Sequence, residues 1–261
     1  MITIEEKQKQ FDILKTSILN CRQCDLALTR TNALPGDGNL EARLMFVAQA
    51  PGEREDQEAC LFIGPSGQIF DQLIKKAGLS RSSIYLTNLL KCTLPKCRKP
   101  KTEEISACQT FLKQEIDLID PDIIFPLGFY ASRSLLHLND LTSPQDKKDF
   151  EQYMGQLFWS GKKKVYPLPH PTSILHTPEN KPLAEHLYVK LNVLSQVCKW
   201  YPLCPMKRLF KKGAIKESWI QLYCTGDWGS CTRYALEARG EYHPDWMLPD
   251  GTLDENLKKW L

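Results

Sequence analysis

The sequence predicts an α/β protein: a three-layer α/β/α sandwich with a four-stranded parallel sheet, followed by a small cysteine-rich module. Over residues 1–197, short apolar runs that resemble buried strands alternate with segments of helical periodicity. This alternation is typical of a parallel sheet covered by helices on both faces. After residue 197 the sequence becomes rich in cysteine and aromatic residues and contains no clear strand. We therefore expect two domains, 1–197 and 198–261.

Each element of the first domain is expected from a local pattern. Apolar runs predict strands over 43–48, 84–88, 122–127 and 164–168. Apolar residues at helical spacing predict helices over 4–20, from a Ser66 N-cap to Gly78, from Thr102 to about 119, over 129–138 and over about 183–198. The segment 49–65 is expected to be a long irregular loop. The carboxyl ends of parallel strands meet at one edge, so the polar segments that begin at Gln49, Asn88, Gly128 and His170 should converge there.

Composition limits the function classes only loosely. The chain has 261 residues, of which 42% are hydrophobic and 25% charged, as in globular proteins. It has no apolar run of about 18 residues, which excludes an ordinary membrane-spanning helix. The N-terminus lacks a basic segment leading into an apolar stretch, so we expect no secretory signal and a cytoplasmic location. A net charge of +3 permits nucleic-acid binding without demanding it.

Ten cysteines are many for a protein expected in the cytosol, where thiols stay reduced. Ligation of a metal or an iron–sulfur cluster is therefore a better explanation than disulfides. A Cys-x-x-Cys pair places two thiolates on one side of a tight turn, and two further cysteines follow at a distance. The candidate ligands are Cys21, Cys24, Cys92 and Cys108. The alternative is that they are buried small residues; Cys97 is a possible stand-in ligand, and Cys60 is expected to be a packed thiol.

Several polar and aromatic residues fall at the expected strand ends. Two segments combine small residues with two carboxylates and an aromatic ring: Ala48-Gln-Ala-Pro-Gly-Glu-Arg-Glu-Asp56 and Leu61-Phe-Ile-Gly-Pro-Ser-Gly67. The small residues let backbone N–H groups approach a ligand closely. His170 is fixed between two prolines, and Asn88 ends an apolar strand with an amide that can both donate and accept. Each feature alone has an ordinary structural explanation as a turn, a core residue or a cap.

Taken together, these motifs resemble the family 4 uracil-DNA glycosylases, the iron–sulfur branch of the uracil-DNA glycosylase superfamily. The family pattern is approximately G-E-x-P-G-x-x-E-D, R-P-F-x-G-x-x-G, T-N-x-x-K-C, a later Cys and H-P-S/A. In this chain the first two correspond to the segments above, and the others to Thr87-Asn-Leu-Leu-Lys-Cys92, Cys108 and His170-Pro-Thr172. The resemblance covers about residues 5–197, and it is carried by the order and spacing of all the motifs.

The resemblance implies a four-stranded α/β/α sandwich and a [4Fe–4S] cluster held by Cys21, Cys24, Cys92 and Cys108. It also implies hydrolysis of the N-glycosidic bond of uracil in single- or double-stranded DNA, by a monomer, to leave an abasic site. Phe62 would stack on the extruded base, and Asn88 would bind its edge. His170 and backbone N–H groups near Gln49 and Ala50 would stabilise the uracil anion.

A water would then attack the sugar, oriented by Glu55 or Asp56, while the segment 172–176 would fill the vacated stack. Two departures stand out: Ala48-Gln49 replaces the family's Gly-Glu, and Leu61 stands where Arg-Pro is common. The first removes a possible water-orienting carboxylate. It leaves two alternatives open: a glycosylase for another deaminated base, or a non-catalytic iron–sulfur nucleic-acid-binding protein on the same scaffold. An electron carrier is disfavoured by the α/β motif set.

The cysteine-rich module lies outside the family pattern. Its four cysteines, Cys198, Cys204, Cys224 and Cys231, would suit a second cluster, and three cysteines with His243 would suit zinc. A module this short has little core of its own and would gain much from such a ligand. The absence of any metal there is the third alternative.

Overall fold

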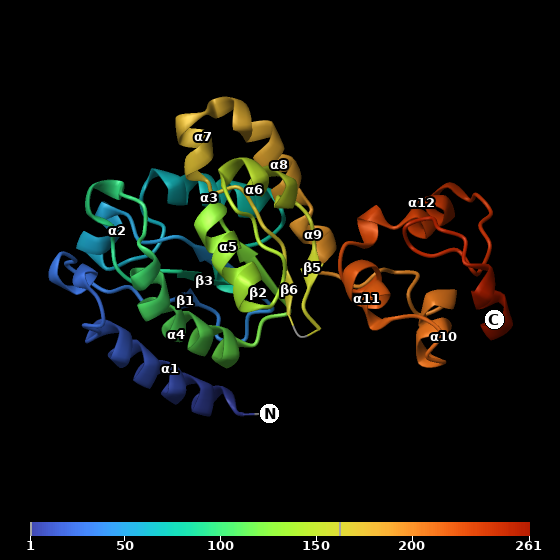
Figure 1. Ribbon diagram of the computed structural model, residues 1–261, viewed down its shortest axis with the longest axis horizontal. Helices are drawn as coiled ribbons and strands as arrows, with labels where there is room; N and C mark the ends of the chain where they lie inside the picture. The colour runs from blue at the N-terminus through green and yellow to red at the C-terminus, as the bar shows by residue number, and fades with distance from the viewer. Residues whose placement is uncertain (1, 162) are drawn as a thin grey trace.

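The structure is a computed structural model that describes residues 2–161 and 163–261. Its centre is a twisted sheet covered by helices on both faces (Figure 1). In the described part of the chain the sheet has six strands in the order β1-β3-β2-β4-β6-β5. Their bounds are β1 Asp37–Gly38, β2 Leu44–Ala48, β3 Tyr85–Asn88, β4 Ile123–Pro126, β5 Phe158–Trp159 and β6 Lys164–Val165.

The four predicted strands form the parallel centre of this sheet. β2 pairs in parallel with both β3 and β4, and β4 pairs in parallel with β6. The expectation of a purely parallel sheet is wrong at the edges, because β1 and β5 run antiparallel to their neighbours. Each edge strand has two residues, which is too short to produce a recognisable apolar run. The three-layer α/β/α prediction is confirmed, with a mixed sheet.

The α-helices are close to the predicted ones, with some differences at their ends. Their bounds are α1 Ile4–Leu19, α2 Glu53–Glu58, α3 Pro65–Lys76, α4 Thr102–Ile119, α5 Phe129–Leu138, α6 Lys147–Tyr153, α7 Thr172–His176, α8 Lys181–Val189, α9 Leu191–Leu194, α10 Pro205–Lys211, α11 Glu217–Trp219 and α12 Thr232–Arg239. Helix α3 begins at Pro65 with Gly64 as its N-cap, so the predicted Ser66 cap is wrong. Proline suits this first helical position because its missing N–H has no helical partner there.

Three other expectations need correction. The predicted loop 49–65 contains helix α2, whose charged sequence shows no apolar periodicity. The predicted helix over 183–198 is divided into α8 and α9. The strand predicted over 164–168 is shorter, because β6 ends at Val165. Beyond it, parallel pairing is limited to one isolated bridge between Leu127 and Leu168.

Alternate residues of β2 serve the two faces of the sheet, which is why the whole strand is apolar. Leu44, Phe46 and Ala48 pack in one buried cluster with residues of α3, α8 and α9. Met45 and Val47 face the other side, where residues of α4 and α5 cover them. Side chains of successive strand residues point to opposite faces, so a strand buried on both sides must be apolar throughout.

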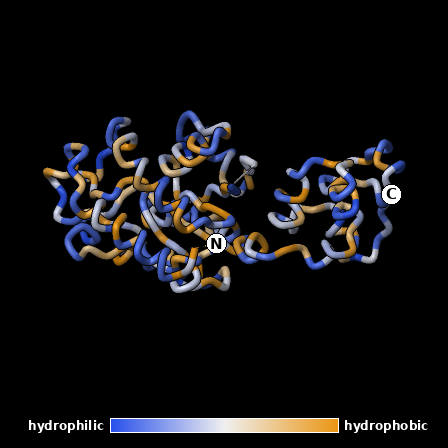
Figure 2. Tube along the Cα trace, turned by 90° about the horizontal axis from the view of Figure 1, so that it is seen from below, coloured by the Kyte–Doolittle hydropathy of each residue, from blue (hydrophilic) through white to orange (hydrophobic). Residues whose placement is uncertain are grey.

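Residues after 197 gather at one end of the molecule, in red and orange in Figure 1, and Figure 2 shows apolar stretches inside this part as well as in the main body. This C-terminal module has its own buried cluster, formed by Met206, Leu209, Ile220, Cys224, Leu248 and Leu257. It contacts the amino end of the sheet, where Lys164 Nζ donates to Thr225 O at 2.6 Å. The domain boundary at 197/198 stays a prediction.

Within the described ranges, no helix is both long enough and apolar enough to cross a membrane.

Candidate active site and cysteine pocket

A cleft of about 720 Å³ opens at the carboxyl ends of the parallel strands. We call it the strand-end cleft. Its walls come from the loops after β2, β4 and β6, represented by Gln49, Gly128 and His170, and from segment 93–98, which follows β3. The structure thus brings together the loops that the sequence predicts at this edge. Ala50 and Thr172 also line the cleft.

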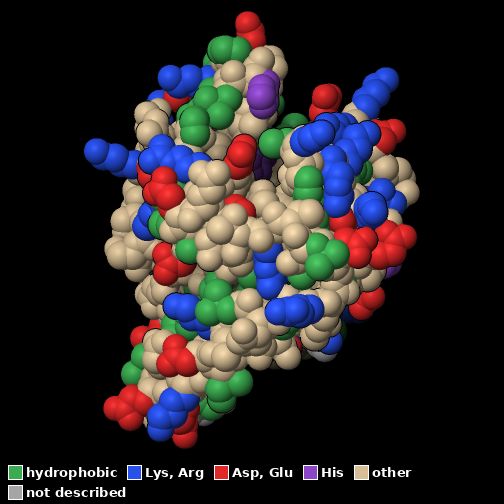
Figure 3. All heavy atoms as spheres, turned by 90° about the vertical axis from the view of Figure 1, so that its left-hand side faces the viewer, with side chains coloured by type: hydrophobic (Ala, Val, Ile, Leu, Met, Phe, Trp, Pro, Cys, Tyr) green, Lys and Arg blue, Asp and Glu red, His purple; other side chains and the backbone are tan. Residues whose placement is uncertain are grey.

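The end of the molecule away from the C-terminal module is seen directly in Figure 3, where Lys and Arg side chains stand on both sides of a hollow. Three basic residues line the strand-end cleft: Lys96, Arg98 and Lys147. The cleft also contains the acidic residues Glu53 and Asp56. Basic side chains around a cleft are suited to contacts with phosphate groups.

His170 lies in the cleft as a neutral hydrogen-bond donor. Burial lowers the pKa of His170 to about 4, so the ring is uncharged at neutral pH. Its Nδ1 accepts the backbone N–H of Thr172 at 3.1 Å, which leaves the proton on Nε2. Gly128 has φ +83°, and a Cβ there would lie 3.2 Å from His170 Cβ. The glycine therefore allows the turn after β4 to pack closely against the histidine.

Asn88 ends β3 with a buried amide whose oxygen is unsatisfied. The residue is 1% exposed, and Oδ1 has no hydrogen-bond partner among the described residues. A buried acceptor without a partner costs about 1–3 kcal/mol. Such groups are rare in native proteins, and this oxygen at the end of β3 is available to a hydrogen-bond donor from outside the described residues. Asn88 itself is not among the residues that line the open cleft.

A buried ion pair holds the backbone next to Asn88. Lys91 Nζ lies 2.5 Å from Glu115 Oε2, and both side chains are almost fully buried. The ammonium also donates to Asn88 O at 2.9 Å and to Thr87 Oγ1 at 2.7 Å. Glu115 in turn accepts the N–H of Gly36 at 2.7 Å. A buried pair tolerates its loss of hydration only with such additional bonds, and these bonds fix the position of the β3 end.

Phe62 is held in an unusual backbone conformation. Its φ is +54°, in the left-handed region that non-glycine residues rarely adopt. Arg81 stabilises it, because Nη2 donates to Phe62 O at 2.5 Å and Nη1 donates to Leu61 O at 3.1 Å. A Cβ at Gly67 would lie 1.8 Å from Phe62 O, so only glycine allows this approach.

The Phe62 ring is buried and packs on Phe70, with ring centroids 4.9 Å apart. It also lies beside His170, with the two centroids 6.2 Å apart. The structure therefore places the predicted stacking residue and the predicted anion-stabilising residue next to each other. Strained residues that are held by specific contacts tend to occur at functional sites.

The two predicted carboxylates have different surroundings. Glu55 is buried and does not line the cleft; its Oε2 accepts the Gly52 N–H at 2.5 Å, which caps α2. Asp56 lines the cleft, but its Oδ2 and Oδ1 accept the backbone N–H groups of Thr31 and Asn32 at 2.8 and 3.1 Å. Both carboxylates thus help to fix the loops that form the cleft wall.

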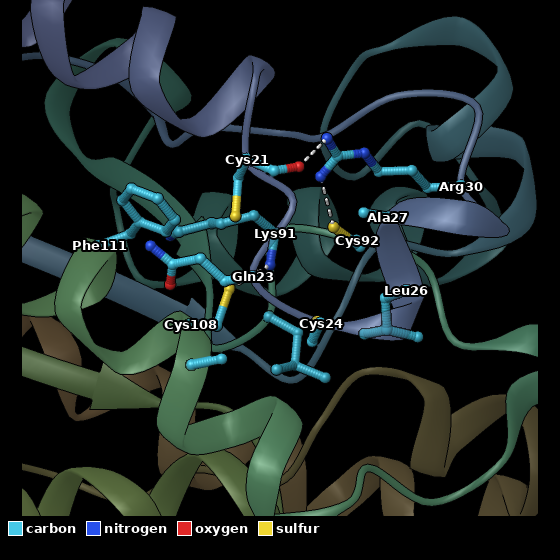
Figure 4. Close-up of a pocket in the computed structure, with 12 residues that line it drawn as sticks. Cys21, Gln23, Cys24, Leu26, Ala27, Arg30, Lys91, Cys92, Cys108 and Phe111 are labelled. Atoms are coloured by element: carbon cyan, nitrogen blue, oxygen red, sulfur yellow. Dashed lines mark hydrogen bonds between the residues drawn. The ribbon is translucent and has the colours of Figure 1, made fainter.

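The four predicted ligands meet in a second place, which we call the cysteine pocket. Cys21, Cys24, Cys92 and Cys108 all line it, and their sulfur atoms point toward a shared space (Figure 4). Cys21 and Cys24 follow α1, Cys92 lies in the loop after β3, and Cys108 lies in α4. Three segments that are distant in sequence therefore converge on one group of four thiols.

Hydrogen-bond donors surround these thiols. Arg30 Nη1 donates to Cys92 Sγ at 3.0 Å and Nη2 donates to Cys21 O at 2.6 Å, as Figure 4 shows. The Lys91 backbone N–H donates to Cys108 Sγ at 3.3 Å. Burial raises the pKa of Cys92, although Arg30 opposes this, and raises that of Cys108 to about 11. A positively charged group bound among the sulfurs would offset this cost of forming buried thiolates.

Four cysteines in one pocket are the ligand set that an iron–sulfur cluster uses. No group of three His, Cys, Asp or Glu side chains in the described part of the chain is arranged to hold one metal ion. An iron–sulfur cluster is larger than an ion, so its four cysteine ligands stand further apart, around the cluster. Four thiols with N–H and guanidinium donors are the environment that such a cluster requires.

The remaining cysteines of the first domain lie outside this pocket. Cys60 is exposed, so the expectation of a packed thiol is wrong; it follows α2 at the surface. Cys97 is also exposed and lines the strand-end cleft, so it does not replace any of the four ligands. All ten cysteines are free thiols in the structure.

The C-terminal cysteines form a third group. Cys198, Cys204, Cys224 and Cys231 line one cavity of about 240 Å³ in the C-terminal module, together with His243. The module contacts the amino end of the sheet, whereas the strand-end cleft is at the carboxyl end. These cysteines are therefore separate from both the cleft and the cysteine pocket.

Sequence reasoning missed the residues that position the site: Lys91, Arg81 and Arg30. Lys91 stands inside the Thr87–Cys92 motif, and that context is the only signal that could have indicated a special role. Arg81 and Arg30 lie in segments without a motif. Their importance arises from long-range contacts with Phe62 O and Cys92 Sγ that local sequence does not reveal.

Comparison with known proteins agrees with this geometry. Residues 35–192 match the model of the uracil DNA glycosylase superfamily. A type-4 uracil-DNA glycosylase of Sulfurisphaera tokodaii is 35% identical over 195 residues, covering 73% of this chain and 87% of the relative. One of Archaeoglobus fulgidus is 33% identical, covering 71% and 94%, and one of Thermotoga maritima is 34% identical, covering 67% and 88%. The chain therefore belongs to the uracil-DNA glycosylase superfamily, within its type-4 family.

Proposed function

We propose that this protein is a DNA-repair glycosylase that hydrolyses the N-glycosidic bond of uracil in DNA and leaves an abasic site. Family membership supports the reaction class, and the unpartnered Oδ1 of Asn88 is the observation that carries the base assignment. Uracil presents a donor at N3–H, which an amide oxygen can accept. Cytosine presents an unprotonated acceptor at the same position, so its N3 would repel that oxygen.

The base must leave the helical stack before the bond to its sugar can be reached. An extruded uracil would stack on the Phe62 ring, whose backbone is held by Arg81. From there the base edge would reach Asn88, and its O2 would reach His170 Nε2. As the bond breaks, negative charge gathers on the uracil, largely at O2. A neutral N–H donor, already oriented in a site shielded from water, stabilises this charge without first having to reorganise.

Small residues let the backbone approach the base on the other side. Ala50 lies at the cleft directly after Gln49, where backbone N–H groups could add to the stabilisation of the anion. For the attacking water we propose Asp56 and Gln49 as orienting residues, because both line the cleft. Glu55 would act as a positioning residue, since its carboxylate holds the turn at Gly52.

The DNA backbone would be bound along the cleft rim by Lys96, Arg98 and Lys147. Helix α7 (172–176) begins at the cleft, and its Leu175 is 45% exposed. An exposed apolar side chain at this place could enter the stack that the flipped base leaves behind. Site and rim come from one chain, so we propose a monomer that acts in the cytoplasm on single- or double-stranded DNA.

For Cys21, Cys24, Cys92 and Cys108 we propose a [4Fe–4S] cluster with a structural role. When bound, it would supply the positive charge that buried thiolates require. The loop that contains Cys92 begins directly after Asn88 and continues into cleft residues 93–98. A cluster bound by Cys92 would therefore keep in position both the Asn88 amide, at the start of this loop, and the cleft wall formed by residues 93–98.

The test is base release by the full chain, purified without oxygen, from oligonucleotides that contain one uracil, hypoxanthine or xanthine. We expect free uracil and an abasic site from the uracil strand, and no release of cytosine or thymine from matched strands. Release of hypoxanthine or xanthine but not uracil would assign the site to another deaminated base. DNA binding without release of any base would identify a non-catalytic binding protein, the alternative that the Gln49 substitution raises.

A further inference from the structure

The C-terminal module contains a cavity that the glycosylase reaction does not use. It has a volume of about 240 Å³ and is lined by Cys198, Cys204, Cys224 and Cys231. Cys198 and Cys224 are buried, and none of the four is in a disulfide. The superfamily match ends at residue 192, so these four cysteines lie beyond the matched region.

Each cysteine comes from a different segment of the module. Cys198 lies in the connection from α9, Cys204 is the N-cap of α10, Cys224 ends the π-helical turn 220–224, and Cys231 is the N-cap of α12. Two of these segments are joined by a backbone hydrogen bond from the Cys198 N–H to Cys224 O at 2.9 Å. A ligand held by all four thiols would connect the whole module.

Cys198 and Cys231 each begin a turn that backbone hydrogen bonds hold. The Tyr201 N–H donates to Cys198 O at 3.0 Å, and the Ala235 N–H donates to Cys231 O at 3.0 Å. The backbone that carries each of these two thiols is therefore fixed at the cavity.

Charge at the cavity is suited to an anionic group. Arg233 is 3% exposed and lines the cavity, and its Nη1 donates to three backbone carbonyls, those of Pro244, Asp245 and Met247. Its Nε is buried and has no hydrogen-bond partner among the described residues. A cluster with four thiolate ligands is negatively charged overall, and a fixed guanidinium beside it would offset that charge, as Arg30 does at Cys92.

Zinc bound by three cysteines and His243 is the alternative ligand set at this cavity. His243 lines the cavity, and its Nε2 lies 3.2 Å from Glu237 Oε1, outside hydrogen-bond geometry. In the part of the chain that the structure describes, no three such side chains are close enough to hold a single ion. A small zinc ion needs short bonds of about 2.0–2.3 Å to its ligands. The cavity, at about 240 Å³, is larger than a single ion needs and therefore points to a larger group.

We propose that Cys198, Cys204, Cys224 and Cys231 hold a second [4Fe–4S] cluster, which stabilises the C-terminal module. The module has a small core of six buried residues, and domains of this size commonly depend on a metal or cluster. The cluster would lie at the end of the sheet opposite the strand-end cleft. Its function is therefore independent of base release.

The experiment counts iron, acid-labile sulfide and zinc per chain in the full-length protein, purified without oxygen. We expect about eight iron and eight sulfide in the wild-type chain and no stoichiometric zinc, since each cubane cluster holds about four of each. The Cys224→Ser/Cys231→Ser variant should retain about four iron, and so should Cys21→Ser/Cys24→Ser. Cys60→Ser, which alters an exposed thiol outside both pockets, should match the wild type.

About four iron with one zinc in the wild-type chain would overturn the proposal in favour of zinc, and about four iron with no zinc would mean no second site. The wild-type count decides the question even if a serine variant fails to fold. Limited proteolysis gives a second readout: loss of the C-terminal cluster should expose residues after 197 to cleavage and leave the first domain intact. No readout here depends on base release, so failure of the proposed glycosylase function would not be confused with failure of this proposal.

Discussion

His170 offers a proton and Asn88 offers a lone pair, and the structure fixes each role through a neighbour. The Thr172 N–H occupies Nδ1 of the histidine, which leaves Nε2–H free to donate. The buried Asn88 side-chain oxygen has no partner in the described part of the chain, while the Asn88 backbone carbonyl accepts a hydrogen bond from Lys91 Nζ. A donor and an acceptor at the ends of two parallel strands match the polarity of the O2 and N3–H groups of uracil.

The depressed pKa of His170 predicts an unusual pH dependence. The ring in the folded protein gains a proton only near pH 4, whereas a free histidine does so near 6.5. We therefore expect the single-turnover rate of uracil release to show no histidine inflection between pH 5 and 8. Because the unfolded chain binds this proton first, His170 should also lower the free energy of unfolding as the pH falls from about 6.5 toward 4.

A matched measurement on His170→Ala separates the two effects. The substitution should lower the single-turnover rate about 10²–10³-fold, as expected when one donor to a developing anion is lost. It should also remove the histidine contribution to the pH dependence of unfolding. An inflection of the wild-type rate near pH 6.5 that disappears in the variant would contradict a neutral His170.

At the scale of elements, the start of α3 determines how Phe62 is presented. Arg81 connects this turn to the helix, because its Nε also lies 2.7 Å from Asp71 Oδ1 in α3. Gly67, in the first turn of α3, leaves the space that Phe62 O occupies. The aromatic ring is thus presented by a strained turn that two side chains and one glycine hold in place.

Arg81→Ala should disturb this turn. We expect a loss of about 1–3 kcal/mol in the free energy of unfolding, since hydrogen bonds from a charged donor to two carbonyls are removed. Uracil release under subsaturating conditions should fall several-fold, because the stacking ring is less well positioned. Thermal or denaturant unfolding and single-turnover kinetics measure the two effects.

Arg54→Ala is the control, because among the described residues the Arg54 side chain forms one exposed ion pair, with Glu58 on α2. It should change stability by less than about 0.5 kcal/mol and leave the rate unchanged. Equal behaviour of the two arginine variants would show that Arg81 does not position Phe62.

The elements also show what local sequence can and cannot predict. The four central strands were predictable because strands buried on both faces are apolar throughout. Helix α2 was not, since its charged sequence has no apolar face and its stability comes from the Gly52–Glu55 cap and from Asp56. The edge strands β1 and β5 were also missed, because pairing with β3 and β6 creates them.

The same distinction applies to the site. His170, Gln49 and Asp56 were predicted at the cleft because they follow strands or stand in a motif, and the structure brings them there. The left-handed backbone of Phe62 and the burial of Lys91 were not predictable, because both depend on partners far along the chain, Arg81 and Glu115. The role of Asp56 was not predictable for the same reason, because its carboxylate binds the backbone of Thr31 and Asn32.

At the scale of the whole molecule, the cleft and the C-terminal module occupy opposite ends of the sheet. Lys164, at the start of β6, donates to Thr225 in the C-terminal module. His170 lies beyond the carboxyl end of β6 and lines the strand-end cleft. The cysteine pocket is connected to the cleft through residues 91–98, but the C-terminal cysteines have no such connection. One cluster would therefore support the active site, and the other would support the module.

Asn88→Leu tests whether the Asn88 amide, whose oxygen has no partner among the described residues, recognises uracil. Leucine keeps the branching at Cγ and removes the buried oxygen that has no partner. The measurement is single-turnover release of uracil together with thermal unfolding, at equal iron content. We predict a rate at least about 10²-fold lower with a midpoint of unfolding no lower than that of the wild type. Uracil release by the variant at the wild-type rate would contradict the account.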